Sequence, residues 1–86
     1  RVHSSVAGAH SFTFSTRSGG PVSLEVFDAA GRSVATARQP YASPGSHSIE
    51  WTGLLPGSRR APSGIYFARL QTGDGVQLAK VAHFAP

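Results

Sequence analysis

The chain of 86 residues contains no cysteine and no methionine, and only four of its residues are acidic. The absence of thiols excludes both a disulfide framework and a thiolate metal site. A calcium site needs several acidic oxygens close together, and four scattered carboxylates supply them poorly. A domain of this length has to be held together by one thin apolar core.

Long apolar runs are also missing, since no stretch approaches the roughly 18 residues that a membrane-spanning helix needs. The first residues lack the pattern of a signal peptide. Because the chain starts at Arg1, without a methionine, we expect a fragment or a processed product whose signal sequence, if any, lies upstream. Sustained helical periodicity is absent too, and glycines and prolines interrupt the chain often.

The net charge of +4 reflects scarce acids more than a dense basic patch, because charged residues make up only 14 % of the chain. Arg59 and Arg60 form an adjacent basic pair. No basic helix, zinc finger or aromatic stacking motif accompanies the charge, so we do not expect nucleic-acid binding. We interpret the pair as part of a solvated, arginine-rich loop that could belong to a partner surface.

The sequence does contain short strand-like runs, separated by turn residues at intervals of about ten residues. This spacing predicts a single all-β domain, an antiparallel β-sandwich of about seven strands, over residues 10–86. Residues 1–9 are mostly small or polar, and we expect them to form a linker or a weak first strand that joins a preceding domain.

Alternation of apolar and polar residues indicates which side chains point into the sandwich. The residues expected to point inward are Phe12, Phe14, Val22, Leu24, Val26, Val34, His47, Ile49 and Trp51. Two prolines and a glycine in residues 39–46 predict a loop that crosses between the sheets. Residues 52–63 form the longest expected connection, and residues 72–75 a tight hairpin.

Two glycines are expected to have different purposes. Asp28 and Gly31 delimit a hairpin turn, in which Gly31 takes a positive φ to match the twist of the strands. Gly64 precedes an aromatic strand, and we expect it to let that strand start close beneath Trp51 without a Cβ between them.

The polar residues show no arrangement that indicates catalysis, a cofactor or a metal. The acids lie in turns or on outward faces, and no two histidines have metal-ligand spacing. These residues are Glu25, Asp28, Glu50, Asp74, His3, His10, His47 and His83. No serine lies in Gly-x-Ser-x-Gly, so we predict that the chain is not an enzyme.

The aromatic residues allow two interpretations. Trp51 and Tyr66 could stack on a carbohydrate, but Trp51 alternates in register with Ile49 and is the largest candidate for the core. Phe27 and Phe67 each lie opposite the apolar face of their own strand. We therefore expect these two to form a small exposed patch for a partner or for the parent protein.

Several motifs occur together in one order along residues 11–84. They are Phe-x-Phe (Phe12, Phe14), apolar alternation leading to Phe-Asp-x-x-Gly-Arg-x-Val (Val22, Leu24, Val26, Phe27, Asp28, Gly31, Arg32, Val34), Gly-x-His (Gly45, His47), Trp51 with Gly53, Ser-Gly-Ile-Tyr-Phe (residues 63–67), and Lys80. The series resembles a small immunoglobulin-like domain found at the C-terminal end of many large secreted bacterial proteins. The family includes the immunoglobulin-like domain of the flagellar hook-cap protein and the C-terminal sorting domain of the type IX secretion system.

The resemblance implies an immunoglobulin-like sandwich without catalytic residues or a cofactor. The motif residues that it implies to be structural are Asp28, Gly31, Arg32, His47, Trp51, Gly53, Gly64, Tyr66 and Lys80. The implied function is that of a C-terminal accessory domain of a larger secreted or cell-surface bacterial protein, with a type IX-like sorting role. Its partners would be the upstream domain of the parent and the outer-membrane secretion machinery.

Two alternative functions remain open. The chain could be a structural spacer or an assembly module of an extracellular or flagellar-type protein. Carbohydrate binding is the second and weaker alternative.

Overall fold

The computed structural model describes residues 2–6 and 9–85, and the side chains from residue 9 onward. Nine strands occur in these ranges. They are β1 (Val2–Val6), β2 (Ala9–Thr16), β3 (Gly20–Phe27), β4 (Ser33–Ala42), β5 (Gly45–Trp51), β6 (Leu54–Leu55), β7 (Arg59–Arg60), β8 (Gly64–Thr72) and β9 (Gly75–His83). The predicted linker or first strand at residues 1–9 lies partly outside the described residues. The side chain of His3 is not among those described.

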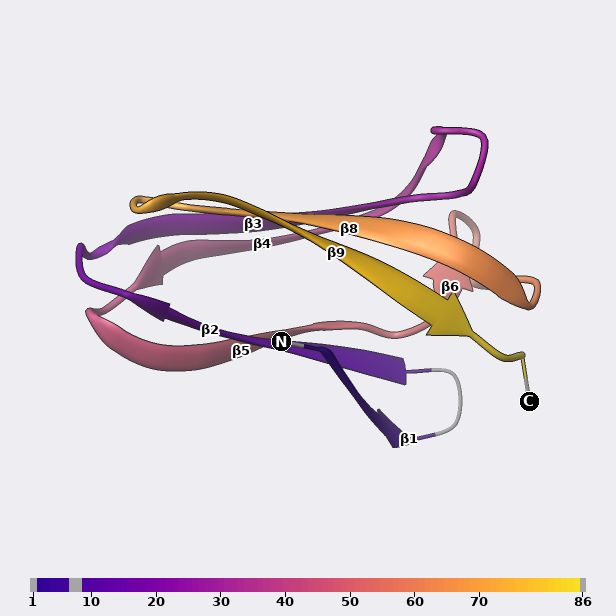
Figure 1. The fold of residues 1–86 in the computed structure, drawn as a ribbon, viewed down its shortest axis with the longest axis horizontal. Coiled ribbons are helices and arrows are strands. Elements are labelled where there is room, and N and C mark those ends of the chain that lie inside the picture. The colour runs from indigo at the N-terminus through magenta and orange to yellow at the C-terminus, as the bar shows by residue number, and fades with distance from the viewer. Residues whose placement is uncertain (1, 7–8, 86) are drawn as a thin grey trace.

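Seven of the strands form two layers, which Figure 1 shows one above the other. One layer is a three-stranded sheet in the order β1-β2-β5, and the other a four-stranded sheet in the order β4-β3-β8-β9. All the pairings are antiparallel. The predicted all-β, immunoglobulin-like sandwich is therefore confirmed. Among the described residues there is no helix of the length and hydrophobicity that a membrane crossing requires.

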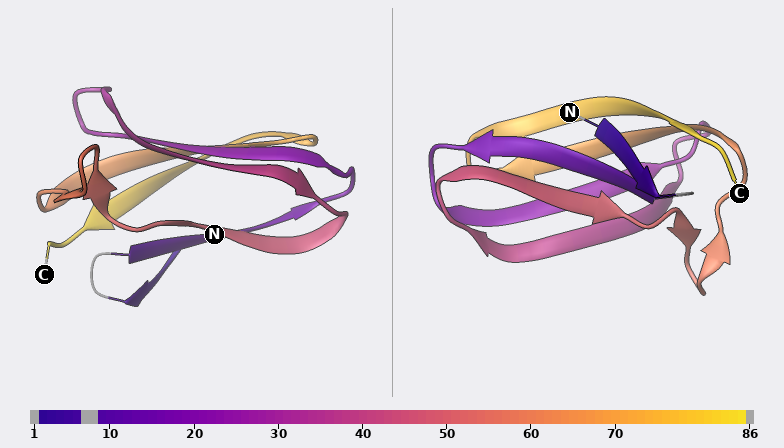
Figure 2. Two further views of the ribbon diagram at one scale, coloured as in Figure 1. Left: turned by 180° about the vertical axis from the view of Figure 1, so that it is seen from behind. Right: turned by 90° about the horizontal axis from the view of Figure 1, so that it is seen from below.

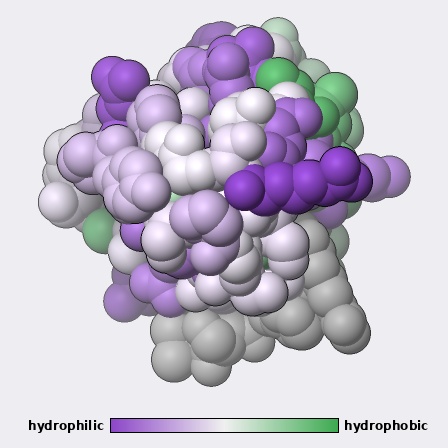
Figure 3. Space-filling model, turned by 90° about the vertical axis from the view of Figure 1, so that its left-hand side faces the viewer, coloured by the Kyte–Doolittle hydropathy of each residue, from purple (hydrophilic) through white to green (hydrophobic). Residues whose placement is uncertain are grey.

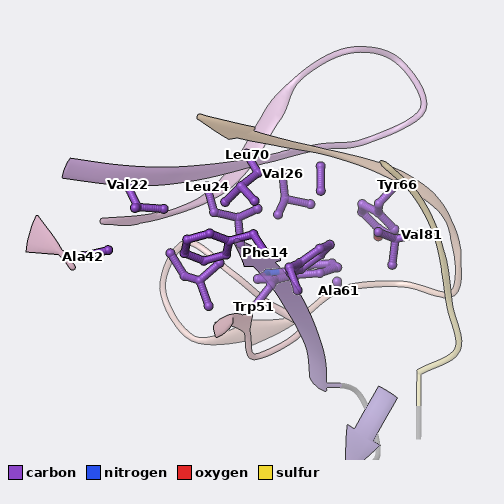
Figure 4. Packing of buried hydrophobic residues seen from close by; sticks show 13 residues of the cluster. Phe14, Val22, Leu24, Val26, Ala42, Trp51, Ala61, Tyr66, Leu70 and Val81 are labelled. Atoms are coloured by element: carbon purple, nitrogen blue, oxygen red, sulfur yellow. The ribbon is translucent and has the colours of Figure 1, made fainter. Parts of the chain in front are cut away.

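The apolar core lies between the layers and is built from alternate residues of the strands (Figure 4). Its members are Phe12, Phe14, Val22, Leu24, Val26, Ala42, Ile49, Trp51, Ala61, Tyr66, Ala68, Leu70 and Val81. Because side chains alternate between the faces of a strand, the predicted inward series on β2, β3 and β5 all reach this core or pack beside it.

The turn between β3 and β4 forms as predicted, with Gly31 at φ +87°. The Asp28 carboxylate accepts hydrogen bonds from the backbone N–H groups of Ala30 (3.0 Å) and Arg32 (2.9 Å). Its second oxygen accepts from Arg32 Nε at 2.9 Å. The ladder then shifts register, since Val26 pairs with Ala35 but Phe27 with Ser33, so that Val34 bulges and is only partly buried against the core.

The loop predicted at residues 39–46 is wrong for most of its length, because β4 continues through Pro40 to Ala42. Proline lacks a donor, but β4 is an edge strand and can place that position away from the ladder. A second register shift, between Gly20 and Val22, accommodates the one extra residue on β4. The crossing between the sheets is confirmed, but only residues 43–44 separate β4 from β5.

The connection predicted at residues 52–63 contains a small hairpin instead of an open loop. β6 and β7 pair through Leu54 with Arg60 and Leu55 with Arg59. Figure 2 shows this hairpin at the end of the sandwich where β9 ends. Arg59 and Arg60 are exposed, as predicted, but they belong to a strand.

The packing role predicted for Gly64 is also wrong. A Cβ built on Gly64 would meet no heavy atom within 4 Å. Its φ of +159° lies at the margin of the region that L residues rarely adopt. Glycine at this position therefore relieves the backbone at the start of β8, and it does not make room beneath Trp51.

Candidate functional site

The two aromatic residues considered for carbohydrate stacking lie inside the protein. Trp51 is 4 % exposed and Tyr66 is 5 % exposed, with ring centroids 5.2 Å apart. The Trp51 indole N–H donates to the carbonyl of Leu54 at 3.1 Å, and the Tyr66 hydroxyl donates to the carbonyl of Pro62 at 2.7 Å. Burial raises the pKa of Tyr66. Since neither ring face is free, the carbohydrate interpretation of this pair is wrong.

A pair of buried histidines lies beside these rings, and the sequence analysis missed it. His83 Nε2 lies 3.1 Å from the carbonyl of Ala61, which can only accept, so this nitrogen carries a proton. In the neutral ring His83 Nδ1 is then the acceptor, and His10 Nε2–H donates to it at 2.9 Å. The bond joins β2 of one sheet to β9 of the other.

The surroundings of the histidine pair are aromatic. His10 stacks on Trp51 with centroids 5.6 Å apart, and His83 meets Tyr66 edge-on at 5.6 Å. Burial lowers the pKa of His10, and the neighbouring His83 lowers it further. No group of three or more metal-ligating side chains occurs among the described residues. This arrangement supports a structural role, because the imidazoles satisfy each other and a carbonyl within the core.

The burial of each histidine, though not their contact, could have been predicted from residue spacing. His10 stands two residues before Phe12, and His83 stands two residues after Val81, so each continues the inward face of its strand. The spacing of the histidines along the chain, which is the signal for a metal site, does not indicate this burial. The contact between β2 and β9 is not visible from local spacing, because the two strands belong to different sheets.

Three other motif residues, Asp28, Arg32 and His47, form hydrogen bonds that stabilise turns. His47 Nε2 donates to the carbonyl of Ser43 at 2.6 Å, across the turn between β4 and β5, and the ring stacks on Phe14. Arg32 forms an ion pair with Asp28, and the hydrogen bond from the Arg32 backbone is the largest cause that lowers the pKa of Asp28. Gly53 has φ +79° in the turn that follows Trp51.

Two adjoining hollows lie along the flank of the sandwich where β4 and β5 are edge strands. The first has a volume of about 560 Å³ and reaches Leu24, Val26 and Trp51. The second, of about 570 Å³, shares Ser33, Val34, Leu55 and Pro56 with the first. Glu50 lines the first and Asp28 the second, so neither hollow contains a pair of carboxylates for acid–base chemistry.

The outward aromatics meet as predicted. Phe27 and Phe67 are direct cross-strand partners on β3 and β8, and Phe67 also pairs with Lys80 on β9. The Arg69 guanidinium lies over the Phe27 ring at 5.9 Å and forms an ion pair with Glu25 at 3.0 Å. The structure therefore brings Phe27, Phe67 and Lys80 together, whereas Arg59 and Arg60 belong to the separate β6–β7 hairpin.

Comparison with known proteins gives similarity in structure only. No protein-family model matches the chain, and no curated protein does. Among solved structures, the chain is similar to FlgD from P. aeruginosa, with a TM-score of 0.68 and 22 % identity over 86 % of this chain. It is also similar to FlgD from Xanthomonas campestris, whose structure concerns hook capping in flagellar assembly, with a TM-score of 0.60 and 26 % identity over 88 % of this chain.

The chain spans 58 % of the first of these FlgD chains and 56 % of the second. The shared part is the β-sandwich described above. The fold of this chain is therefore FlgD-like.

Proposed function

We propose that this chain is a non-catalytic structural module of a flagellar-type or other extracellular assembly. The observation that carries the proposal is the FlgD-like fold, since one of the similar structures belongs to a protein described by its role in hook capping. Because the chain spans little more than half of those proteins, their role in assembly is carried over here as a proposal.

The internal chemistry supports a structural module. Trp51, Tyr66 and the histidine pair are used inside the core. Asp28, Arg32 and His47 hold turns in place. What the module offers to other molecules is its surface, so its function depends on what it connects. We place it at the cell surface or outside the cell, joined to an upstream domain of its parent protein.

A sorting role in type IX secretion stays a prediction, because it rests only on the motif resemblance. The two functions differ in which step fails when the domain is lost. We propose to delete residues 9–86 from the intact parent and to measure export and assembly separately. A matched control replaces the domain with an unrelated β-sandwich of similar size, so that loss of bulk is distinguished from loss of the module.

A further inference from the structure

The outer face of the four-stranded sheet exposes apolar side chains that belong to neighbouring strands. The exposed fractions are 38 % for Ile65, 44 % for Phe67, 55 % for Val76 and 77 % for Leu78. Single exposed apolar residues are normal, but a group of them on one face is typical of an interaction site. Figure 3 views the end of the molecule that carries the β8–β9 turn, and there hydrophobic side chains gather at the upper right margin of a mostly hydrophilic or neutral surface.

The strand register shows that these residues form one surface, because directly paired residues point to the same side of a sheet. Phe27, Phe67 and Lys80 form one row across β3, β8 and β9. The next row contains Glu25, Arg69 and Leu78. Further pairs on the same face join Gln71 to Val76 and Ile65 to Ala82. We call this surface, from Phe27 to Leu78, the β8–β9 face.

The charge of the β8–β9 face is positive. Glu25 is its acid, and its carboxylate is already paired with Arg69. Lys80 forms no ion pair within the part of the chain that the structure describes. Two copies of this face would therefore repel each other, whereas a partner with a carboxylate near Lys80 would be attracted.

The strand at the margin of this face, β9, is open for pairing. It is the last strand in its sheet, so within the described ranges its outer backbone edge has no neighbour. It pairs with β8 in unbroken register from Gly64 with His83 to Thr72 with Gly75. It contains no proline. The opposite edge, β4, contains Pro40 and two register shifts, which are the usual protections of an edge strand.

We propose that β9 binds an extended segment of another protein by strand addition. Backbone hydrogen bonds along β9 would align the segment, and side-chain pairs along the β8–β9 face would select it. The segment has apolar residues beside Val76 and Leu78 and a carboxylate opposite Lys80. Strand addition at β9 rests on the proposed structural role of the chain. It specifies the surface and the class of partner through which the chain would act.

An anionic membrane is the other partner that matches an apolar and basic surface. Recognition of anionic lipids by charge relies on clusters of about four to eight basic residues. The whole outer face of this sheet carries three, Arg38, Arg69 and Lys80, and Arg69 is paired with Glu25. The charges therefore favour a protein strand.

The test uses two synthetic ten-residue peptides in which the alternate positions that would lie beside Val76 and Leu78 are valine. The position on the same face that would lie opposite Lys80 is glutamate in one peptide and lysine in the other. Each is titrated into the isotope-labelled chain while amide chemical shifts and amide hydrogen exchange are followed. We expect saturable shifts and slowed exchange along β9, with the glutamate peptide binding at least about threefold more tightly than the lysine peptide. Lys80→Glu should reverse this preference. Arg38→Glu is the matched control and should preserve it, because Arg38 lies on the same face but on β4, three strands away from β9.

The proposal is overturned by equal binding of the two peptides, by shifts centred on the β4 edge, or by no saturable binding. It is also overturned if vesicles of phosphatidylcholine and phosphatidylserine shift the β9 amides while neither peptide does. Thermal melts of both variants establish that they are folded. This assay uses only the chain and the peptides, so a negative result would refute strand addition alone. The structural role is tested separately, by the deletion experiment in the parent protein.

Discussion

Burial of the Trp51 side chain stabilises the folded state. The ring packs against Tyr66, His10 and other residues of the core. We predict that Trp51→Ala lowers the free energy of unfolding by about 3–5 kcal/mol, the cost typical of deleting a large aromatic side chain from a core. Urea unfolding followed by circular dichroism measures the change. Trp51→Phe, which keeps an apolar ring, should cost clearly less. A loss below about 1 kcal/mol for the alanine variant would contradict the core assignment.

His10 makes stability depend on pH. In the folded chain its pKa is lowered mainly by burial and further by His83. In the unfolded chain the pKa stays at about 6.5. The unfolded state therefore binds a proton more readily, and stability falls as the pH drops below about 6.5 towards the folded pKa. Above that value this contribution is constant.

The measurement is the urea midpoint at a series of pH values between neutral and mildly acidic. We predict a falling midpoint for the parent chain and a flatter profile for His10→Gln. His47→Gln is the control, because His47 lies on β5, is more exposed than His10 and does not contact the buried pair. Identical pH profiles for the parent chain and His10→Gln would show that the buried pair does not set the dependence.

The β3–β4 hairpin depends on the left-handed conformation of Gly31. We predict that Gly31→Val costs about 1–2 kcal/mol or more, because a β-branched residue is forced to positive φ. D-Alanine, introduced by chemical synthesis, should be tolerated at Gly31, since its mirror-image preference suits φ +87°. Thermal melts compare these chains with Gly31→Ala. Equal damage from D- and L-alanine would show that handedness is not the reason for this glycine.

Gly64 requires a different explanation from the one based on sequence. The sequence predicted close packing beneath Trp51, but the structure shows open space around the position where a Cβ would lie. Any cost of Gly64→Ala should therefore arise from the backbone and be small beside that of Gly31→Val.

The strands that could be predicted are those in which one face is buried, because period-two alternation is a direct consequence of burying one side. This holds for Phe12 with Phe14 and for Ile49 with Trp51. The loop rule failed at Pro40, since proline is compatible with an edge strand and edges are not visible from local sequence. The contact between His10 and His83 could not be predicted because it joins residues 73 positions apart through the topology. The contact between Phe27 and Phe67 could be predicted, because each lies on the face of its strand opposite the buried apolar residues.

In the whole molecule, the two sheets enclose Trp51, Tyr66 and the histidine pair in the core. The ordered motifs of the sequence identified this architecture well. They did not distinguish export from assembly, because the same motif residues hold turns and core in place whatever the surface binds. That distinction depends on the parent protein and its partners.

The most direct test is the fate of the parent protein after deletion of residues 9–86. We predict that the truncated parent is exported normally, keeps its intrinsic activity and fails to enter its extracellular assembly, and that an unrelated sandwich does not restore assembly. Retention of the truncated parent inside the cell envelope would contradict the structural-module proposal and support a sorting function.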